Sequence, residues 1–302
     1  MELCIKNDDF LDSFDQLLSI ENCKCNDTQL HLFMLKINSN KFDKDYFVKK
    51  IKNPVIDYAL SRTVKEKYKD RPADLVDEAR TKFRNYLSNK GELGEFLLFC
   101  FLESHLKAPK ILSKLELKTS TENYVNGSDG VHFRQLPNGD YQIIFGESKM
   151  IINLTKALTD AFESIYEFKN EINKQGKEKS GINYEKSLIS DHLEKETFTE
   201  EEAEFLDSII YPKRTNKFDV DHSFGIFIGY EVTINEDDKK LPNKDFRNKI
   251  KEQIKTEILS RKAHIIKKIT EFDLIGHQFY IYIIPFTNLD ETREEITKRI
   301  SK

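Results

Sequence analysis

The stretch Gly127–Lys149, GSDGVHFRQLPNGDYQIIFGESK, sets the expected fold of this 302-residue chain. Two strand-like runs, Val131–Gln135 and Tyr141–Phe145, flank the segment LPNGD at 136–140. Proline fixes its φ angle, whereas asparagine and glycine tolerate the positive φ angles of tight turns. The pattern therefore predicts a β-hairpin.

Charged side chains come together at the open end of this predicted hairpin. Because side chains alternate along a strand, Glu147 and Lys149 share a face with the apolar Ile143 and Phe145. Asp129 precedes the partner strand, and antiparallel pairing brings it beside Glu147. The sequence thus predicts that one Asp, one Glu and one Lys converge where an apolar core meets solvent.

The order of these residues resembles the catalytic core of the PD-(D/E)xK nuclease superfamily. In that motif an Asp is followed by a hairpin and then by Glu-x-Lys, and here Ser128-Asp129 stands where Pro-Asp is usual. A wider run is similar to the nuclease subunit of the Hachiman anti-phage defence system. The similarity is dense from Gly91 to Lys149 and thin outside it, and it is carried by GELGEFLLFCFLE from Gly91, Ala108-Pro109, Ser113-Lys114, GSDGVHF and GESK.

The resemblance implies a fold and an activity. The fold is an α/β restriction-endonuclease-like core, a mixed sheet flanked by helices, with an N-terminal α/β subdomain. The activity is metal-dependent hydrolysis of DNA, with Mg²⁺ or Mn²⁺ as cofactor and a helicase of the same defence system as partner. Oxygen donors suit these ions, and Asp129, Glu147 and the backbone carbonyl of Ser148 are the expected ligands. Lys149 would orient or help deprotonate the attacking water and counter the transition-state charge.

Glu95 is the expected fourth member of the site. It enters a helix that is apolar nearly all round from Phe96 to Leu102, where a carboxylate is costly to bury without a cation or metal. Superfamily members often bring such an acid to the metal from the preceding helix. The alternative is that Glu92 and Glu95 only serve the first helical turn, where the macrodipole favours acids by ~0.3–1 kcal/mol. We predict that Glu95 is catalytic and that Glu92 is a capping residue.

Simpler interpretations of the hairpin remain open. A surface hairpin with a cross-strand Glu–Lys pair would gain only ~0.2–1 kcal/mol from that pair. A second alternative is a non-catalytic DNA- or protein-binding module on a degenerate nuclease fold, but the intact Asp129, Glu147 and Lys149 set favours an enzyme. A stand-alone restriction endonuclease would need a sequence-reading element, and none is recognisable.

Composition limits the class of protein. With 38% hydrophobic and 33% charged residues, and no apolar run longer than Phe96–Leu102, the sequence predicts no membrane-spanning segment. The net charge of −4 argues against a broad electrostatic hold on DNA, so any DNA contact must come from a local basic surface. No phosphate-binding loop of the ATPase type is present. The absence of a signal-peptide pattern and of paired CxxC spacing favours a reduced, cytoplasmic protein. The four cysteines are Cys4, Cys23, Cys25 and Cys100.

We expect residues 1–71 to form an N-terminal subdomain. It shows a helical pattern at Phe10–Leu18, a strand-like run at Leu30–Ile37 and a second helical pattern at Tyr46–Leu60 that Pro54 interrupts. The charged run that ends at residue 71 is interpreted as a linker to the next domain.

Residues 72–302 form the expected nuclease domain. Its predicted elements alternate between helices and strands, and a charged, acidic insertion at about 170–221 interrupts them. This insertion is interpreted as a mobile lid or a partner surface. The elements are a helix from Pro72 with Leu75, Ala79, Phe83 and Leu87 on one face, a helix at Gly91–Leu106, a strand at Leu115–Thr119, the hairpin, a helix at Asn153–Lys169, a strand at Phe224–Glu231, a helix at Asp245–Ile269 and a strand at Gln278–Ile284.

The helix predicted at Asp245–Ile269 carries an excess of cations. Lys251, Lys255 and Lys262 are the candidates for contacts with a DNA backbone. The alternative is a solvated amphipathic helix in a lysine-rich protein. His132, three residues after Asp129, is expected to point to the opposite face as a packing or solvent histidine.

Overall fold

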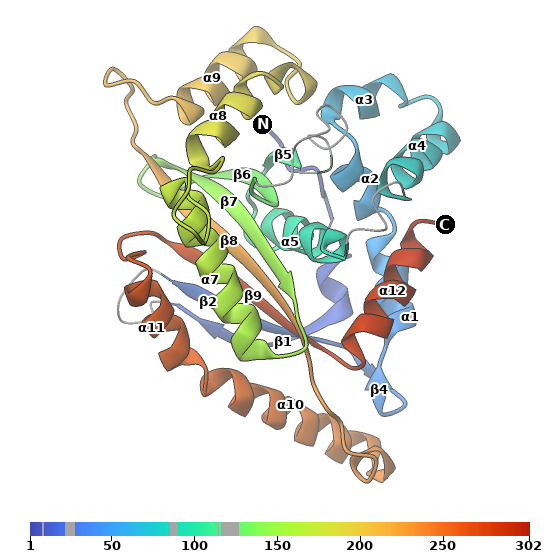
Figure 1. Ribbon diagram of the computed structural model, residues 1–302. Helices are drawn as coiled ribbons and strands as arrows, with labels where there is room; N and C mark the ends of the chain where they lie inside the picture. The colour runs from blue at the N-terminus through green and yellow to red at the C-terminus, as the bar shows by residue number, and fades with distance from the viewer. Residues whose placement is uncertain (8, 22–27, 85–89, 114, 116–126) are drawn as a thin grey trace.

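A computed structural model describes residues 1–7, 9–21, 28–84, 90–113, 115 and 127–302. Within these residues the chain forms a seven-stranded mixed sheet with helices packed against it (Figure 1). The strand order is β1-β2-β9-β8-β7-β6-β5. The strands are β1 Phe14–Ile20, β2 Gln29–Leu35, β5 Lys110–Ser113, β6 Gly130–Gln135, β7 Tyr141–Met150, β8 Val220–Glu231 and β9 Phe279–Phe286; β3 Ile37–Asn38 and β4 Lys41–Phe42 form a separate small ribbon.

The direction of pairing changes between the middle and the edges of the sheet. The central strands β2, β9, β8 and β7 pair in parallel, whereas β1 and the β6–β5 edge pair antiparallel. All eight residues of β9 are buried, as expected for a parallel strand covered on both faces. The expected mixed α/β sheet flanked by helices is therefore confirmed.

Helices cover both faces of the sheet. On β7, Phe145 packs against Phe168 of α7, while a Cβ at the next residue, Gly146, would approach Leu98 of α5 to 2.9 Å. Because neighbouring residues of a strand point to opposite faces, α5 and α7 lie on opposite faces. The helices are α1 Lys44–Ile51, α2 Pro54–Ala59, α3 Arg62–Lys67, α4 Pro72–Arg84, α5 Glu92–Ser104, α7 Leu154–Asn170, α8 Ile182–Ser190, α9 Glu200–Ile210, α10 Asn243–Leu259, α11 Lys262–Glu271 and α12 Leu289–Ile300, with short 3₁₀ turns η1 Leu11–Ser13, η2 Leu193–Lys195 and η3 Asp238–Lys240.

Helix α5 is the interior helix that its sequence predicts. All 13 of its residues are buried, including Cys100. Phe101 stacks on Tyr282 of β9 at 4.8 Å between ring centroids, and Phe96 contacts Tyr58 of α2 at 5.4 Å. Since the helix packs on the sheet on one side and on α2 on the other, its position is tightly fixed.

The hairpin is confirmed in strand content, register and turn. Val131 pairs with Phe145 and Gln135 with Tyr141. Gly139 has φ +95°, which the turn requires and which glycine adopts without strain. The predicted helix after the hairpin and the predicted strands that became β8 and β9 are also present.

The N-terminal segment and the rest of the chain share one sheet. Leu30 of β2 pairs with Ile281 of β9, so residues 1–71 contribute two strands to the sheet that carries the hairpin. The helix expected at Phe10–Leu18 is wrong, because this stretch forms η1 and strand β1. Its apolar spacing suits a helix, but pairing with β2 and packing of Phe14 on Phe101 decide the structure.

Two further expectations are corrected. The single long helix at Asp245–Ile269 is wrong, because α10 ends at Leu259 and α11 begins at Lys262. Its predicted apolar stripe is buried all the same, at Phe246, Ile250, Ile254 and Ile258. The charged run before Pro72 is partly helical, as α3, rather than a plain linker.

Some helices of the structure were not predicted from the sequence, and some predicted residues lie outside the described ranges. Residues 171–219 between α7 and β8, hereafter the insertion, contain α8, η2 and α9, and the C-terminal α12 was not predicted. Leu87 and, apart from Leu115, the strand expected at Leu115–Thr119 fall outside the described residues. No helix in the described ranges is long and apolar enough to span a bilayer.

Candidate active site

The site lies where β7 runs on beyond the end of its pairing with β6. The last regular pair joins Val131 to Phe145, and the Asp129 amide then donates to the Gly146 carbonyl at 2.8 Å. From Glu147 onward, β7 remains paired with β8. This arrangement places Asp129 opposite Glu147, as the predicted hairpin requires, and opens the end of the strand to a cavity.

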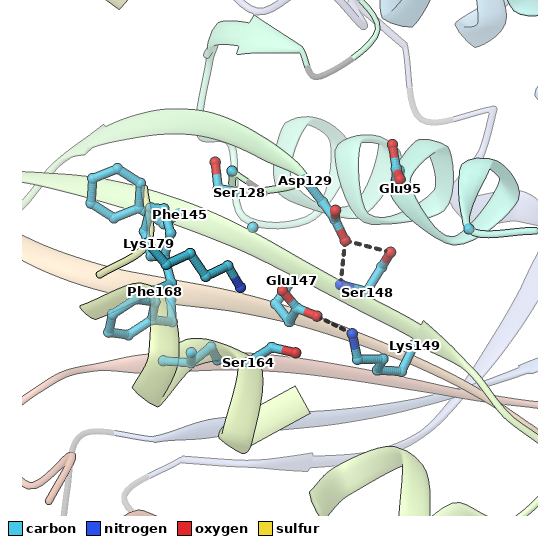
Figure 2. A pocket seen from close by; sticks show the side chains of 15 residues that line it. Glu95, Ser128, Asp129, Phe145, Glu147, Ser148, Lys149, Ser164, Phe168 and Lys179 are labelled. Atoms are coloured by element: carbon cyan, nitrogen blue, oxygen red, sulfur yellow. Dashed lines mark hydrogen bonds and ion pairs between the residues drawn. The ribbon is translucent and has the colours of Figure 1, made fainter. Parts of the chain in front are cut away.

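Asp129 is held in one orientation by its neighbour on β7. Its Oδ2 accepts hydrogen bonds from both the backbone amide and the hydroxyl of Ser148, each at 2.7 Å (Figure 2). The residue is 9% exposed. Because these donors approach the same oxygen, the carboxylate is fixed without being closed off from the cavity that it lines.

Glu147 and Lys149 lie on the face of β7 that is covered by α7. The Lys149 Nζ atom is 2.5 Å from Glu147 Oε1. Both side chains line the cavity together with Ser164 and Phe168 of α7 (Figure 2). The charged pair therefore sits at the end of the apolar face, in the arrangement that strand alternation predicts.

Glu95 reaches the same cavity from α5. A Cβ on the preceding residue, Gly94, would lie 3.1 Å from the Ser148 hydroxyl, so a larger residue there would require a small shift of the helix or of the Ser148 side chain. Glu95 is 3% exposed and lines the cavity. Glu92 lies outside the cavity lining, where its Oε1 accepts a hydrogen bond from the buried Tyr58 hydroxyl at 2.9 Å.

The cavity has a volume of about 230 Å³ and a strongly charged lining. The charged side chains that line it are Glu95, Asp129, Glu147, Lys149 and Lys179. No three His, Cys, Asp or Glu side chains among the described residues come close enough to enclose a metal ion. Mg²⁺ needs only one or two carboxylates, because it keeps several waters and takes further oxygens from substrate phosphates. The oxygen donors of this cavity fit such an ion.

A family model for HamA matches residues 9–300. The chain belongs to the HamA family. HamA is a component of the multi-component Hachiman anti-phage defence system. The match extends from η1 to the last residue of α12 and so covers the N-terminal strands and the insertion, well beyond the run that carries the resemblance in the sequence. No curated protein matches the sequence.

Two residues of this HamA site were missed by sequence analysis, and both come from the insertion. Lys179 lines the cavity, and Glu185 of α8 accepts hydrogen bonds from the hydroxyl and amide of Ser128 at 2.8 and 3.4 Å. Ser128 directly precedes Asp129. The insertion carries no periodic or motif-like signal at these positions, so only the folded arrangement identifies them.

The other candidate residues lie away from the cavity. His132 is buried, its Nδ1 hydrogen-bonds the Ala108 carbonyl at 2.9 Å, and burial lowers its pKa to about 4. It is a packing histidine, as one of the two sequence interpretations holds. On α10, Lys251 pairs with Asp15 at 2.7 Å and Lys255 with Glu252 at 3.0 Å. Neither these two lysines nor Lys262 of α11 line the cavity.

Proposed function

We propose that this HamA-family protein is a metal-dependent DNA nuclease that cuts invading DNA as the effector of its defence system in the cytoplasm. One observation carries the proposal: Asp129, Glu147, Lys149 and Glu95 line one cavity, where Asp129 is hydrogen-bonded to Ser148 and Lys149 pairs with Glu147. Four charged groups gathered at a strand end have no evident structural purpose. Such an arrangement suits hydrolysis of a phosphodiester, which requires a positioned water and neutralisation of charge.

The metal-binding groups proposed here are drawn from Asp129, Glu147, Glu95 and the backbone carbonyl of Ser148. Because no three carboxylates enclose an ion by themselves among the described residues, one or two of them would bind it directly, and waters or phosphate oxygens would complete its shell. A bound Mg²⁺ or Mn²⁺ would supply Lewis-acid stabilisation of the phosphoryl oxygens and a more acidic water. The two donors from Ser148 keep Asp129 in a fixed orientation, so little reorganisation is needed on loading.

Lys149 has a separate role in the proposal. Its ammonium group lies against Glu147 at the cavity wall, within reach of a water bound beside that carboxylate. It would hold the water in line with the phosphorus and donate hydrogen bonds to the oxygen on which charge develops. Because Glu147 anchors the ammonium, Lys149 keeps this position before DNA arrives.

Substitution of the site tests the proposal directly. With supercoiled and linear DNA and Mg²⁺, we expect Glu147→Gln and Lys149→Ala to lower the cleavage rate about 100-fold or more. The matched control is Glu252→Gln, which changes an exposed Glu–Lys pair on α10. Removal of the metal by EDTA should abolish wild-type cutting, and Mn²⁺ should restore it. Wild-type rates in the purified, folded Glu147→Gln variant would refute the site assignment.

Glu95 and Glu92 provide a second comparison within one helix turn. Glu95→Gln should reduce cleavage more than Glu92→Gln, because only Glu95 faces the cavity. The readout is the Mg²⁺ concentration for half-maximal cleavage. Equal shifts in both variants would return Glu95 to a purely structural role.

A helicase partner is part of the same proposal. Two observations support it: the membership in a multi-component system and the absence of any ATPase phosphate loop in an acidic chain. A stable complex should bury more than ~1,000 Å². Co-expression with the neighbouring helicase should give co-purification and ATP-dependent control of cutting. The partner would be removed from the proposal if the two proteins formed no complex and if the chain cut DNA equally well with and without the helicase.

A further inference from the structure

The insertion contributes one residue to the lining of the cavity. Lys179 is its contribution: the Lys179 amide donates to the Glu171 carbonyl at 2.8 Å, and its Nζ donates to Glu167 of α7 at 3.2 Å. In Figure 2 the ammonium end of Lys179 is directed toward the side of the cavity where Glu147 lies. A second cation, from a different part of the chain than Lys149, therefore faces the proposed reaction centre.

The insertion is anchored at two places, which argues against a freely moving lid. Near the cavity, Glu185 accepts two hydrogen bonds from Ser128. Further along, the carboxylate of Glu196 pairs with Lys110 of β5 at 3.3 Å, and both side chains are fully buried. Glu196 also lies 3.4 Å from Arg62 of α3. The position of Lys179 is thus tied to the sheet and to the loop that carries Asp129.

We propose that Lys179 is a phosphate-binding residue that holds the DNA backbone at the cavity. This inference rests on the proposed nuclease function and adds a substrate contact to it. An ammonium group has three donors, and a single carboxylate contact leaves donors for a phosphate oxygen. The side chain is 22% exposed, so a contact made there is less screened by water and salt than one on the open surface.

The charge of the cavity favours this role. Three carboxylates, two ammonium groups and one divalent ion leave one net positive charge, which complements the single negative charge of a phosphodiester. The two lysines are not equivalent. Lys149 pairs with Glu147, which is itself a proposed ligand, whereas the partner of Lys179 is Glu167, which does not line the cavity. Lys179 is therefore suited to hold substrate rather than water.

The chain contains a matched control for Lys179. Lys174 lies five residues earlier in the insertion and pairs with Glu163 of α7 at 2.9 Å. Glu163 precedes Glu167 by four residues, about one helical turn. Lys174 is 64% exposed and does not line the cavity. The two lysines thus share segment, partner type and partner helix, and differ in their access to the cavity.

The experiment compares Lys179→Ala, Lys179→Arg and Lys174→Ala in DNA cleavage and in DNA binding. Binding is measured in a Glu147→Gln background, so that the DNA stays intact. We expect Lys179→Ala to raise KM and Kd about 10-fold or more. The slope of log K against log salt should fall by ~0.9 for duplex DNA. Lys179→Arg should retain most of the affinity, and Lys174→Ala should match wild type.

The outcomes separate this inference from the proposed function. Equal effects of Lys179→Ala and Lys174→Ala on KM and on the salt slope would overturn the inference while leaving the nuclease intact. Absence of wild-type cleavage would overturn the proposed function, and the binding comparison would still test the contact. If Lys179→Ala melts early, the Glu167→Gln, Lys179→Met double variant removes both charges together. Wild-type DNA affinity in that folded variant would also overturn the inference.

Discussion

The insertion and helix α10 are both rich in charged residues, yet they relate to the cavity in opposite ways. On α10 the lysines are numerous, and Lys251 and Lys255 are paired with Asp15 and Glu252 at the molecular surface. The insertion is acidic around α9 but places one lysine in the cavity and one buried glutamate against the loop of Asp129. The number of cations in a segment therefore does not identify a binding site. The position of each cation relative to the cavity in the folded chain is more informative.

The largest expected difference between the insertion and α10 is the stability lost when one anchoring carboxylate is removed from each. Glu196→Ala removes the carboxylate that pairs with the fully buried Lys110, and we expect the free energy of unfolding to fall by about 3–5 kcal/mol. The equivalent change on α10, Glu252→Ala, breaks an exposed pair and should cost below ~1 kcal/mol. Urea denaturation of both variants measures the difference. Similar losses would mean that the insertion is no more firmly attached than a surface helix.

A smaller effect is expected from Glu185, which touches the site indirectly. Glu185→Ala should lower cleavage about 10- to 100-fold, because loss of its bonds to Ser128 displaces the neighbouring Asp129. A positioning role predicts a higher Mg²⁺ requirement in the folded variant.

The control for Glu185 lies in the same insertion. Glu202 accepts a hydrogen bond from the exposed Phe198 amide at 2.9 Å, so Glu202→Ala should leave the metal requirement as it is. If both variants shifted it equally, Glu185 would not act through Asp129.

The pH dependence of stability should also differ between a histidine in the core and one near the surface. Burial lowers the pKa of His132, beside α5, to about 4 from 6.5. Between these values the unfolded chain binds a proton that the folded chain does not, so stability is lost as the pH falls from 6.5 to 4. His132→Asn should flatten this decline. Burial also lowers the pKa of His264 on α11, but this residue is only half-buried and lies outside the core. We therefore expect His264→Asn to change the pH dependence less than His132→Asn does. Denaturation midpoints at pH 7.0, 5.5 and 4.5 provide the measurement.

The smallest effect concerns the α10–α11 lysines as DNA contacts. Replacing Lys251, Lys255 and Lys262 together by Gln should change duplex affinity less than about twofold, because Lys251 and Lys255 are already paired with carboxylates and none of the three lines the cavity. Each phosphate contact that is really lost would lower the salt slope by ~0.9. If the slope of log K against log salt fell by two or more units, this face would bind the DNA backbone, and the contrast between α10 and the insertion would be wrong.

The local parts of the fold follow from the sequence, because their signals are local. The hairpin turn, the apolar α5 and the break at Pro54 each rest on residues within one element. The placement of Asp129 opposite Glu147 follows in the same way from the turn and the period of a strand.

The parts that could not be predicted depend on contacts between distant segments. The stretch Phe10–Leu18 has helical spacing, and only the presence of β2 beside it makes it a strand. Lys179 and Glu185 lie in sequence without recognisable pattern, and their roles arise from α8 packing next to Ser128. No proline or glycine in the sequence marks the break between α10 and α11.

The place of β9 in the sheet has a consequence for the order of folding. This strand, Phe279–Phe286, lies between β2 and β8, so the β1–β2 pair meets the strands that carry the site only through a segment that comes far later in the chain. Until β9 emerges from the ribosome, β2 and β8 have no partner on that side, and the platform beneath α5 is incomplete. Assembly of the sheet therefore requires contacts of long sequence separation, which slow folding. The sheet beneath α5 is therefore completed only after β9 has been synthesised.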